Sequence, residues 1–113
     1  MPRLLVTGFG VFPGAPVNPT EKLVRALREA PPPLDGVGTF RAELLDVDYA
    51  TISGRLSEIG RSFSPDIAIH FGLAQTAAGF RLEEVARNEI AALRPDNSGS
   101  QPASAAIWRI VTA

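Results

Sequence analysis

Hydrophobic residues follow two different spacings along most of the chain, and together they indicate alternating strands and helices. Residues 3–9 are almost continuously apolar, which is typical of a parallel strand covered on both faces. Residues 64–74, SPDIAIHFGLA, form a second run of this kind that ends in a glycine turn, and residues 39–47 form a weaker one. The chain therefore predicts three strands.

Two amphipathic helices are expected between these strands, over residues 18–30 and 49–63. In each, apolar side chains recur at spacings of three and four, with charged residues mostly on the opposite face. Asn18, followed by Pro19 and Glu21, is a strong helix-start signature. The apolar positions are Leu23, Val24 and Leu27 in the first helix, and Ile52, Leu56, Ile59 and Phe63 in the second. The order strand, helix, strand, helix, strand predicts an α/β fold with right-handed crossovers.

The loop between the first strand and the first helix contains Gly8-Phe9-Gly10, which begins like the G-x-G-x-x-G loop that binds phosphate. Such a loop directs backbone N–H groups and a helix N-terminus at the anion. Here Pro13 occupies the third glycine position and has no N–H to donate, and Phe12 adds a bulky ring beside it. We therefore favour a loop whose two phenylalanine rings line an apolar pocket. Simple packing of these rings in the core is the alternative.

Composition narrows the classes of function further. The 113 residues carry a formal net charge of −1, which suits one domain and gives no basic field for a nucleic-acid partner. No apolar run approaches the roughly 18 residues of a membrane span, and the N-terminus lacks signal-peptide features, so we expect a cytoplasmic protein without a membrane partner. The chain contains no cysteine, so it offers no disulfide, thiolate metal site or cysteine nucleophile. We predict no metal and no cofactor.

Three stretches of the chain share their order and spacing with the motifs of one known family. Residues 6–21, VTGFGVFPGAPVNPTE, correspond to T-G-F-x-x-F-x-G followed by N-P-[ST]. Residues 65–74, PDIAIHFGLA, correspond to P-D-x-x-[IL]-x-x-G-x-A. Residues 81–99, RLEEVARNEIAALRPDNSG, correspond to I-E-x-x-A-x-N and a P-D-N-x-G turn. Together they resemble the pyroglutamyl peptidase I family, the pyrrolidone-carboxylate cysteine peptidases.

The resemblance implies a three-layer α/β/α sandwich with a mostly parallel sheet, which would be incomplete in this chain. It covers residues 3–99 and corresponds to the amino-terminal half of the family's fold. We expect residues 1–113 to form a single domain whose tail, residues 100–113, is unmatched to the family. Because a parallel sheet needs cover on both faces and protection at its edges, we expect either self-association into a homo-oligomer or marginal stability.

The family removes N-terminal pyroglutamate from peptides with a cysteine, a histidine and a glutamate. Carried over by motif, the aromatic residues that flank the lactam ring of the pyroglutamyl peptide are Phe9 and Phe12, and Leu73 falls in the same substrate-binding pocket. A flat, neutral ring gains most from aromatic faces and apolar burial. The catalytic glutamate falls on Glu83, and the adjacent Glu84 is the competing assignment. Without the family, a solvated acidic pair on a helix face would be the preferred interpretation.

The match also has departures. In the family, cysteine and histidine lie in the second half of the chain, and His70 falls on a non-catalytic strand position, where we expect a satisfied core residue. Thr76-Ala77 replace a Gly-Arg pair, and an arginine implicated in oxyanion stabilisation falls on Leu93. Residues 77–94 have a helical apolar stripe, whereas the family implies an extended segment, which we adopt. We expect this chain alone to be inactive; the alternative is a non-catalytic small-molecule or protein-interaction module derived from the same fold.

Overall fold

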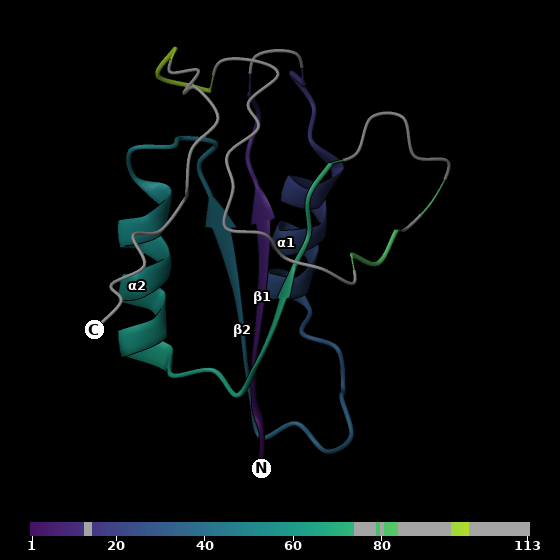
Figure 1. Cartoon of the computed structure of the whole chain (residues 1–113). Coiled ribbons are helices and arrows are strands. Elements are labelled where there is room, and N and C mark those ends of the chain that lie inside the picture. Colours follow the sequence, from purple (N-terminus) through teal and green to yellow (C-terminus); the bar gives the residue numbers. More distant parts are fainter. Residues whose placement is uncertain (13–14, 74–78, 80, 84–95, 100–113) are drawn as a thin grey trace, which may run out of the picture.

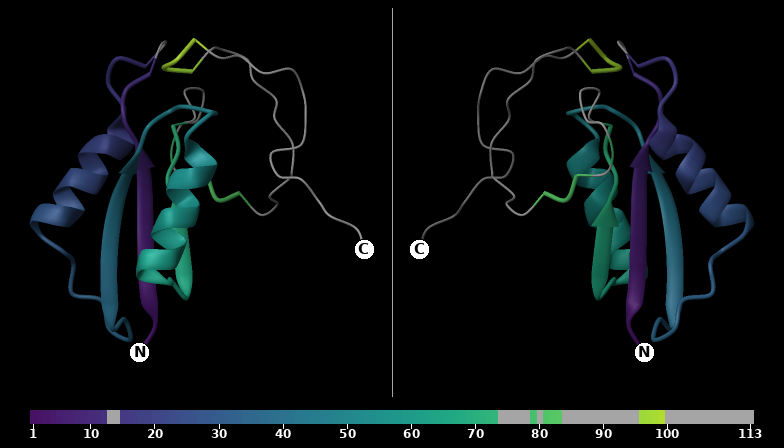
Figure 2. Two further views of the ribbon diagram at one scale, coloured as in Figure 1. Left: turned by 90° about the vertical axis from the view of Figure 1, so that its left-hand side faces the viewer. Right: turned by 90° about the vertical axis from the view of Figure 1, so that its right-hand side faces the viewer.

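The structure is a computed structural model that describes residues 1–12, 15–73, 79, 81–83 and 96–99. Its elements alternate along the chain as the sequence predicts, and the two helices lie on opposite faces of the sheet (Figures 1 and 2). This arrangement confirms the α/β fold. The elements are β1 (Arg3–Phe9), α1 (Pro19–Glu29), β2 (Thr39–Leu45), α2 (Ile52–Phe63) and β3 (Ile67–His70). In the described part of the chain, no helix is long and apolar enough to cross a membrane.

The sheet has the strand order β2-β1-β3, and both pairings are parallel. β1 pairs with β2 from Arg3 opposite Thr39 to Phe9 opposite Leu45. It pairs with β3 from Leu4 opposite Ile67 to Thr7 opposite His70. Because β1 is central, its five middle residues are all buried, which explains why it is the most continuously apolar strand of the chain.

Several predicted boundaries change in the structure. The second helix begins at Ile52 rather than residue 49, because Asp48 organises a turn before it. The Asp48 side chain accepts a hydrogen bond from the Ala50 N–H at 2.8 Å, and its carbonyl oxygen accepts one from the Ile52 N–H at 3.1 Å. The second strand ends at Leu45.

The third strand is shorter than residues 64–74, and the prediction that His70 is a core residue is wrong. All four residues of β3 are exposed, because the strand lies at the margin of the sheet. His70 is nevertheless satisfied, since its Nδ1 lies 2.6 Å from the hydroxyl of the buried Thr7 on the neighbouring strand.

Each helix packs its apolar face on the sheet. On the α2 face, the buried core cluster consists of Leu5, Leu45, Ile59 and Phe63, with Phe9, Ile52 and Leu56 packed against it. On the α1 face, Val24 is fully buried beside Gly8 of β1. A Cβ atom at Gly8 would lie 2.7 Å from both the Thr20 carbonyl oxygen and the Val24 side chain. The first glycine of the Gly8-Phe9-Gly10 motif therefore allows α1 to approach the sheet.

A cluster of charges surrounds β2, which we call the Glu43 cluster: Glu43 with Arg28, Arg41 and Arg55. One carboxylate oxygen of Glu43 lies 3.0 Å from Arg28 Nη2 and 2.8 Å from Arg55 Nη2, and the other accepts from Arg41 Nε at 2.5 Å. Arg28 comes from α1 and Arg55 from α2, on opposite faces of the sheet. The cluster therefore ties both helix layers together around β2.

Candidate functional site

The carboxyl ends of the three parallel strands lie at one edge of the sheet, and the predicted ring-binding residues are there. Phe9 is the last residue of β1, Phe12 follows it closely, and Leu73 follows β3. The connection after β1 leads to α1 on one face, and the connection after β2 leads to α2 on the other. In α/β proteins, ligands bind outside the carboxyl ends of strands where such connections diverge.

The residues of the N-P-T motif hold the loop that carries both phenylalanines. Asn18 caps α1: its Oδ1 accepts from the Thr20 N–H at 3.0 Å and from the Thr20 hydroxyl at 2.8 Å. The Asn18 amide nitrogen donates to the Gly10 carbonyl oxygen at 3.1 Å, and the Phe9 N–H donates to Thr20 Oγ1 at 2.8 Å. The helix start and the phenylalanine loop are therefore one hydrogen-bonded unit. The Glu21 side chain forms an ion pair with Arg25 one turn further along the helix, at 2.9 Å.

The loop uses its backbone amides internally, which argues against a phosphate site. Besides the Phe9 amide, the Gly10 N–H donates to the Leu45 carbonyl oxygen at 3.0 Å. Phe12 and Ala15 exchange two hydrogen bonds, of 3.2 and 2.9 Å, across the tip of the loop. Phosphate loops need such amides free to converge on the anion. The glycine motif therefore serves close packing rather than anion binding.

Both phenylalanines are half-buried, and they differ in what they contact. Phe9 packs against the core cluster, so simple core packing explains part of its burial. Phe12 lies beyond the end of β1, where an isolated bridge to Ala15 fixes its backbone. Packing against the core cluster therefore accounts for part of the burial of Phe9, and Phe12 is the better candidate for contact with a ligand.

Replacing Asn18 by alanine should destabilise the chain by about 1.5 kcal/mol, because Asn18 is only 2% exposed and its loss leaves the Gly10 carbonyl and the Thr20 amide without their partner. Urea unfolding measures this change. Asn97→Ala is the matched control, since the exposed Asn97 side chain makes one hydrogen bond of this kind, to the Val11 carbonyl oxygen. Equal losses for the two variants would contradict the assignment of Asn18 as the organiser of the loop.

The turn at residues 96–99 also contacts this edge of the sheet, and the sequence analysis assigned it no role. Asp96 is 2% exposed, and its carboxylate accepts from the Tyr49 N–H at 2.7 Å and from the Ser98 N–H at 3.0 Å. Asn97 donates from its backbone to the Val47 carbonyl and from its side chain to the Val11 carbonyl. The turn thereby joins the loop after β2 to the phenylalanine loop. An Asp-Asn pair before a glycine indicates a turn, but its partners depend on the tertiary fold.

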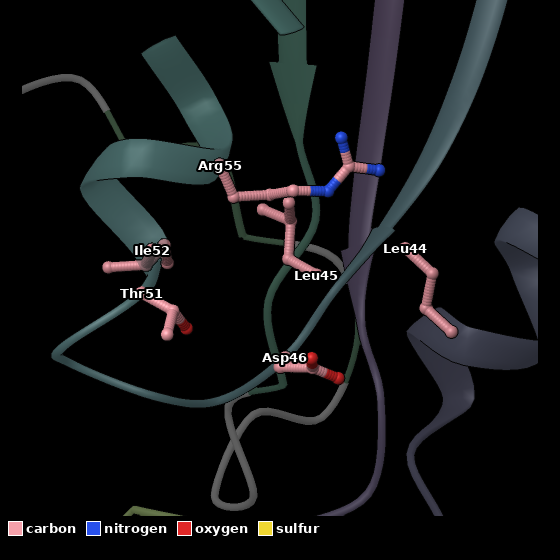
Figure 3. A pocket seen from close by; sticks show the side chains of 6 residues that line it. All are labelled: Leu44, Leu45, Asp46, Thr51, Ile52 and Arg55. Carbon is pink, nitrogen blue, oxygen red and sulfur yellow. The ribbon is translucent and has the colours of Figure 1, made fainter. Parts of the chain in front are cut away.

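A pocket of about 150 Å³ opens at the carboxyl end of β2 (Figure 3). Of its lining residues, Leu45 belongs to the buried core cluster against which Phe9 packs, and Ile52 packs against the same cluster. Asp46 and Arg55 lie at opposite ends of the pocket, and the lining contains none of the predicted site residues. Its volume is well below the roughly 300 Å³ at which drug-sized ligands begin to fit, so it suits only a small group. The lining residues are Leu44, Leu45, Asp46, Thr51, Ile52 and Arg55.

In the part of the chain that the structure describes, no hydrogen bond or ion pair joins Glu83 to the phenylalanine loop. Glu83 is exposed, in a stretch without helix or strand, beside Leu82, which is 92% exposed. Glu84, Leu93 and Thr76-Ala77 lie outside the described residues. The choice between Glu83 and Glu84 therefore stays a prediction, as does the extended form of residues 77–94. Among the described side chains, no group of three His, Asp or Glu could hold a metal ion.

Known proteins match this chain along almost its whole length. The family described as pyroglutamyl peptidase matches residues 2–111. The pyrrolidone-carboxylate peptidase 1 of Ralstonia nicotianae is 37% identical over 111 residues, which are 95% of this chain and 48% of that protein. The pyrrolidone-carboxylate peptidase of Pyrococcus furiosus is 34% identical over 103 residues, which are 88% of this chain and 46% of that protein.

Solved structures agree with these sequence matches. The pyrrolidone carboxyl peptidase of Fervidobacterium islandicum superposes with a TM-score of 0.84 at 33% identity, over 94% of this chain and 50% of that one. That of Pyrococcus furiosus superposes with a TM-score of 0.81 at 33% identity, over 92% and 49%. The chain thus spans about half the length of the curated relatives it matches. Sequence and fold agree that this chain belongs to the pyroglutamyl peptidase family.

Proposed function

We propose that this chain supplies the amino-terminal half of a site that removes N-terminal pyroglutamate from peptides. The observation that carries the proposal is the convergence of two family motifs on one loop. Asn18 and Thr20 fix the backbone of Phe9 and Gly10, and the turn at residues 96–99 reaches the same loop through the Val11 carbonyl. A loop anchored from two sides presents aromatic rings in a defined place, which is what recognition of a small flat ring requires.

The proposed roles follow from the chemistry of amide hydrolysis. Phe9, Phe12 and Leu73 would enclose the lactam ring, and Glu83 would orient a histidine that activates a cysteine. The chain has no cysteine, so the nucleophile and its histidine would come from the half of the family's fold that this chain does not span. In this proposal the chain contributes substrate recognition and the orienting carboxylate.

The chain alone should release no product from a chromogenic pyroglutamyl amide above a heat-killed control. The decisive comparison is a joined polypeptide, in which this chain is followed by the half of the Pyrococcus furiosus relative that it does not match. The joined polypeptide should hydrolyse the amide, and replacing its nucleophilic cysteine by serine should abolish the reaction. Turnover by the chain alone would show that another nucleophile operates and would refute the division of roles.

In the joined polypeptide, Phe12→Ala should raise KM by roughly tenfold and leave kcat nearly unchanged, because it removes a ring contact made in the ground state and in the transition state. Steady-state kinetics with the same amide separate the two constants. Phe40→Ala is the control, since Phe40 is also half-buried but lies within β2. The pocket assignment fails if both variants lose only folding stability.

A second candidate function is a non-catalytic binding module derived from the same fold. Thr76-Ala77 and Leu93 favour it, because they replace a Gly-Arg pair and an arginine that the family's site carries. The joined polypeptide separates the two functions: binding of a pyroglutamyl amide without turnover supports the module, and turnover supports the peptidase.

A further inference from the structure

One side of β2 is open, and part of the backbone of the strand points toward it. β2 ends the strand order β2-β1-β3, so in the described part of the chain no strand lies on its outer side. The Gly10 N–H, directly after β1, donates to the Leu45 carbonyl oxygen, so the backbone groups of Leu45 point toward β1. Backbone groups of successive residues point to alternate sides of a strand. The groups that face the open side therefore belong to Phe40, Ala42 and Leu44.

The side chain of Arg28 crosses this open side from one face of the sheet to the other. Arg28 comes from α1, whereas Leu45 belongs to the core cluster on the opposite face, under α2 (Figure 2). Glu43 stands two residues before Leu45 and therefore points to the α2 face as well. Arg28 nevertheless lies 3.0 Å from the Glu43 carboxylate, and its Nε donates to the Ala42 carbonyl oxygen at 2.7 Å. The guanidinium group thus passes around the edge of β2 and binds a carbonyl that faces outward.

The Glu43 cluster holds this bridge in place. Glu43 is only 8% exposed, and Arg41 and Arg55 bind its carboxylate from β2 itself and from α2. Arg28 is therefore fixed at its backbone by the helix and at its guanidinium group by a carboxylate that two other arginines hold. A planar guanidinium group has enough N–H donors to bind a carbonyl and a carboxylate at once. Because the Arg28 side chain is 46% exposed, it covers the open side of the sheet and not the core.

The sequence of β2 is complementary to itself. Ala42 is the central residue of Thr39–Leu45, and two copies related by a twofold axis would pair these strands antiparallel about that centre. Arg41 of one copy would then lie opposite Glu43 of the other, and the reverse. Opposite charges across neighbouring strands stabilise such a pair. A second copy of this chain is therefore the partner that an unprotected β2 edge would recruit.

We infer that Arg28 is an edge guard, which keeps β2 from pairing with the β2 strand of a second copy of this chain. Antiparallel pairing about Ala42 would require the outward-facing carbonyl of this residue in both copies, and Arg28 occupies it. The approaching strand would also have to displace a charged group that is already hydrogen-bonded. The inference goes beyond the proposed peptidase site and does not depend on it, because contacts between α1 and β2 carry it.

Arg28→Met removes the guard, because methionine keeps an unbranched side chain that suits a helix but has no N–H group to donate. Residue-resolved amide hydrogen exchange is measured at low and at high protein concentration. In this variant the outward-facing amides of Phe40, Ala42 and Leu44 should exchange roughly tenfold more slowly at the high concentration. In the unchanged chain their exchange should not depend on concentration. Sedimentation should show the mass of Arg28→Met rising toward that of a dimer over the same range.

Arg25→Met is the matched control. Arg25 lies on the same helix, its side chain is 62% exposed, and it pairs with Glu21 of that helix. The change removes the same charge without touching β2, so the outward-facing amides should behave as in the unchanged chain. If they become protected in Arg25→Met as strongly as in Arg28→Met, the loss of a positive charge causes the association and the inference is wrong.

The amides of β2 that face β1 report whether each variant is folded, and they should stay protected throughout. These are the amides of Arg41, Glu43 and Leu45. Arg28→Gln is a second variant for the case in which Arg28→Met loses this protection, since glutamine is shorter and neutral but also suits a helix. It should show the same slowing of the outward-facing amides as is expected for Arg28→Met.

Two further results would overturn the edge guard. One is exchange of the outward-facing amides that stays independent of concentration in a folded Arg28 variant. The other is association of that variant with new protection in β3, residues 67–70, and none in β2, which would place the contact at the opposite edge of the sheet.

Discussion

Glu83→Gln in the joined polypeptide is expected to lower kcat by roughly a thousandfold while KM changes little. Glutamine keeps the size of the side chain but loses the negative charge that would hold the histidine in the required tautomer and stabilise its cationic form. Because Glu83 would act through the histidine, it is a positioning residue. Steady-state kinetics across the pH range measure the change, and the acidic limb of the pH profile of kcat/KM should also move to lower pH, since the histidine loses an anionic neighbour.

Glu84→Gln is the control for this prediction, since it changes the adjacent acid in the same way. The proposed match to the motif I-E-x-x-A-x-N would put the functional carboxylate at Glu83, so Glu84→Gln should leave kcat within about twofold of the unchanged protein. If Glu84 proves the sensitive position, the motif is displaced by one residue. If the two variants behave alike, neither acid orients the histidine, and the exposed position of Glu83 in the structure is simply that of a solvated side chain.

The helices and strands that could be predicted from the sequence are those whose bounds are set by residues within the same segment. β1 has its predicted bounds because a continuous apolar run has few alternatives to a buried strand. The start of α1 follows from Asn18 and Pro19, which cap the helix and begin it within a few residues. Once β1 is assigned, Phe9 is its last residue and Phe12 follows closely. Their placement at the carboxyl edge of the sheet therefore follows from the bounds of β1.

The features that could not be predicted depend on contacts between distant segments. Burial of Asp96 requires the Tyr49 amide, which is 47 residues away in the sequence. The exposure of β3 depends on which strands lie beside it, whereas its apolar sequence indicates only that a covered position suits it. Sequence patterns also give no partners for a charged residue such as Glu43, which stands between apolar positions of β2.

Glu43 leads to the largest stability change that we expect in the described part of the chain. Burial alone would raise the pKa of this carboxyl group, but the hydrogen bond from Arg41 and the charges of Arg41, Arg28 and Arg55 together hold the pKa below its ordinary value of 4.5. At neutral pH the ionised side chain therefore stabilises the folded state. Glu43→Gln removes one charge and leaves three guanidinium groups close together without it, which should cost about 3 kcal/mol at pH 7.

The pH dependence of this loss gives the sharper test. Since the folded-state pKa of Glu43 is lower than the unfolded one, its stabilisation is fully present above about pH 4.5 and is lost as pH falls through the folded-state value. Urea unfolding at pH 7 and at decreasing pH should show the difference between the unchanged protein and Glu43→Gln shrinking below pH 4.5. Glu58→Gln is the matched control: its side chain is 67% exposed and lies 4.0 Å from Arg55, so it should cost no more than about 0.5 kcal/mol at any pH. A Glu43→Gln deficit that stays constant down to acid pH would mean that packing of the side chain, and not its charge, joins the two helix layers around β2.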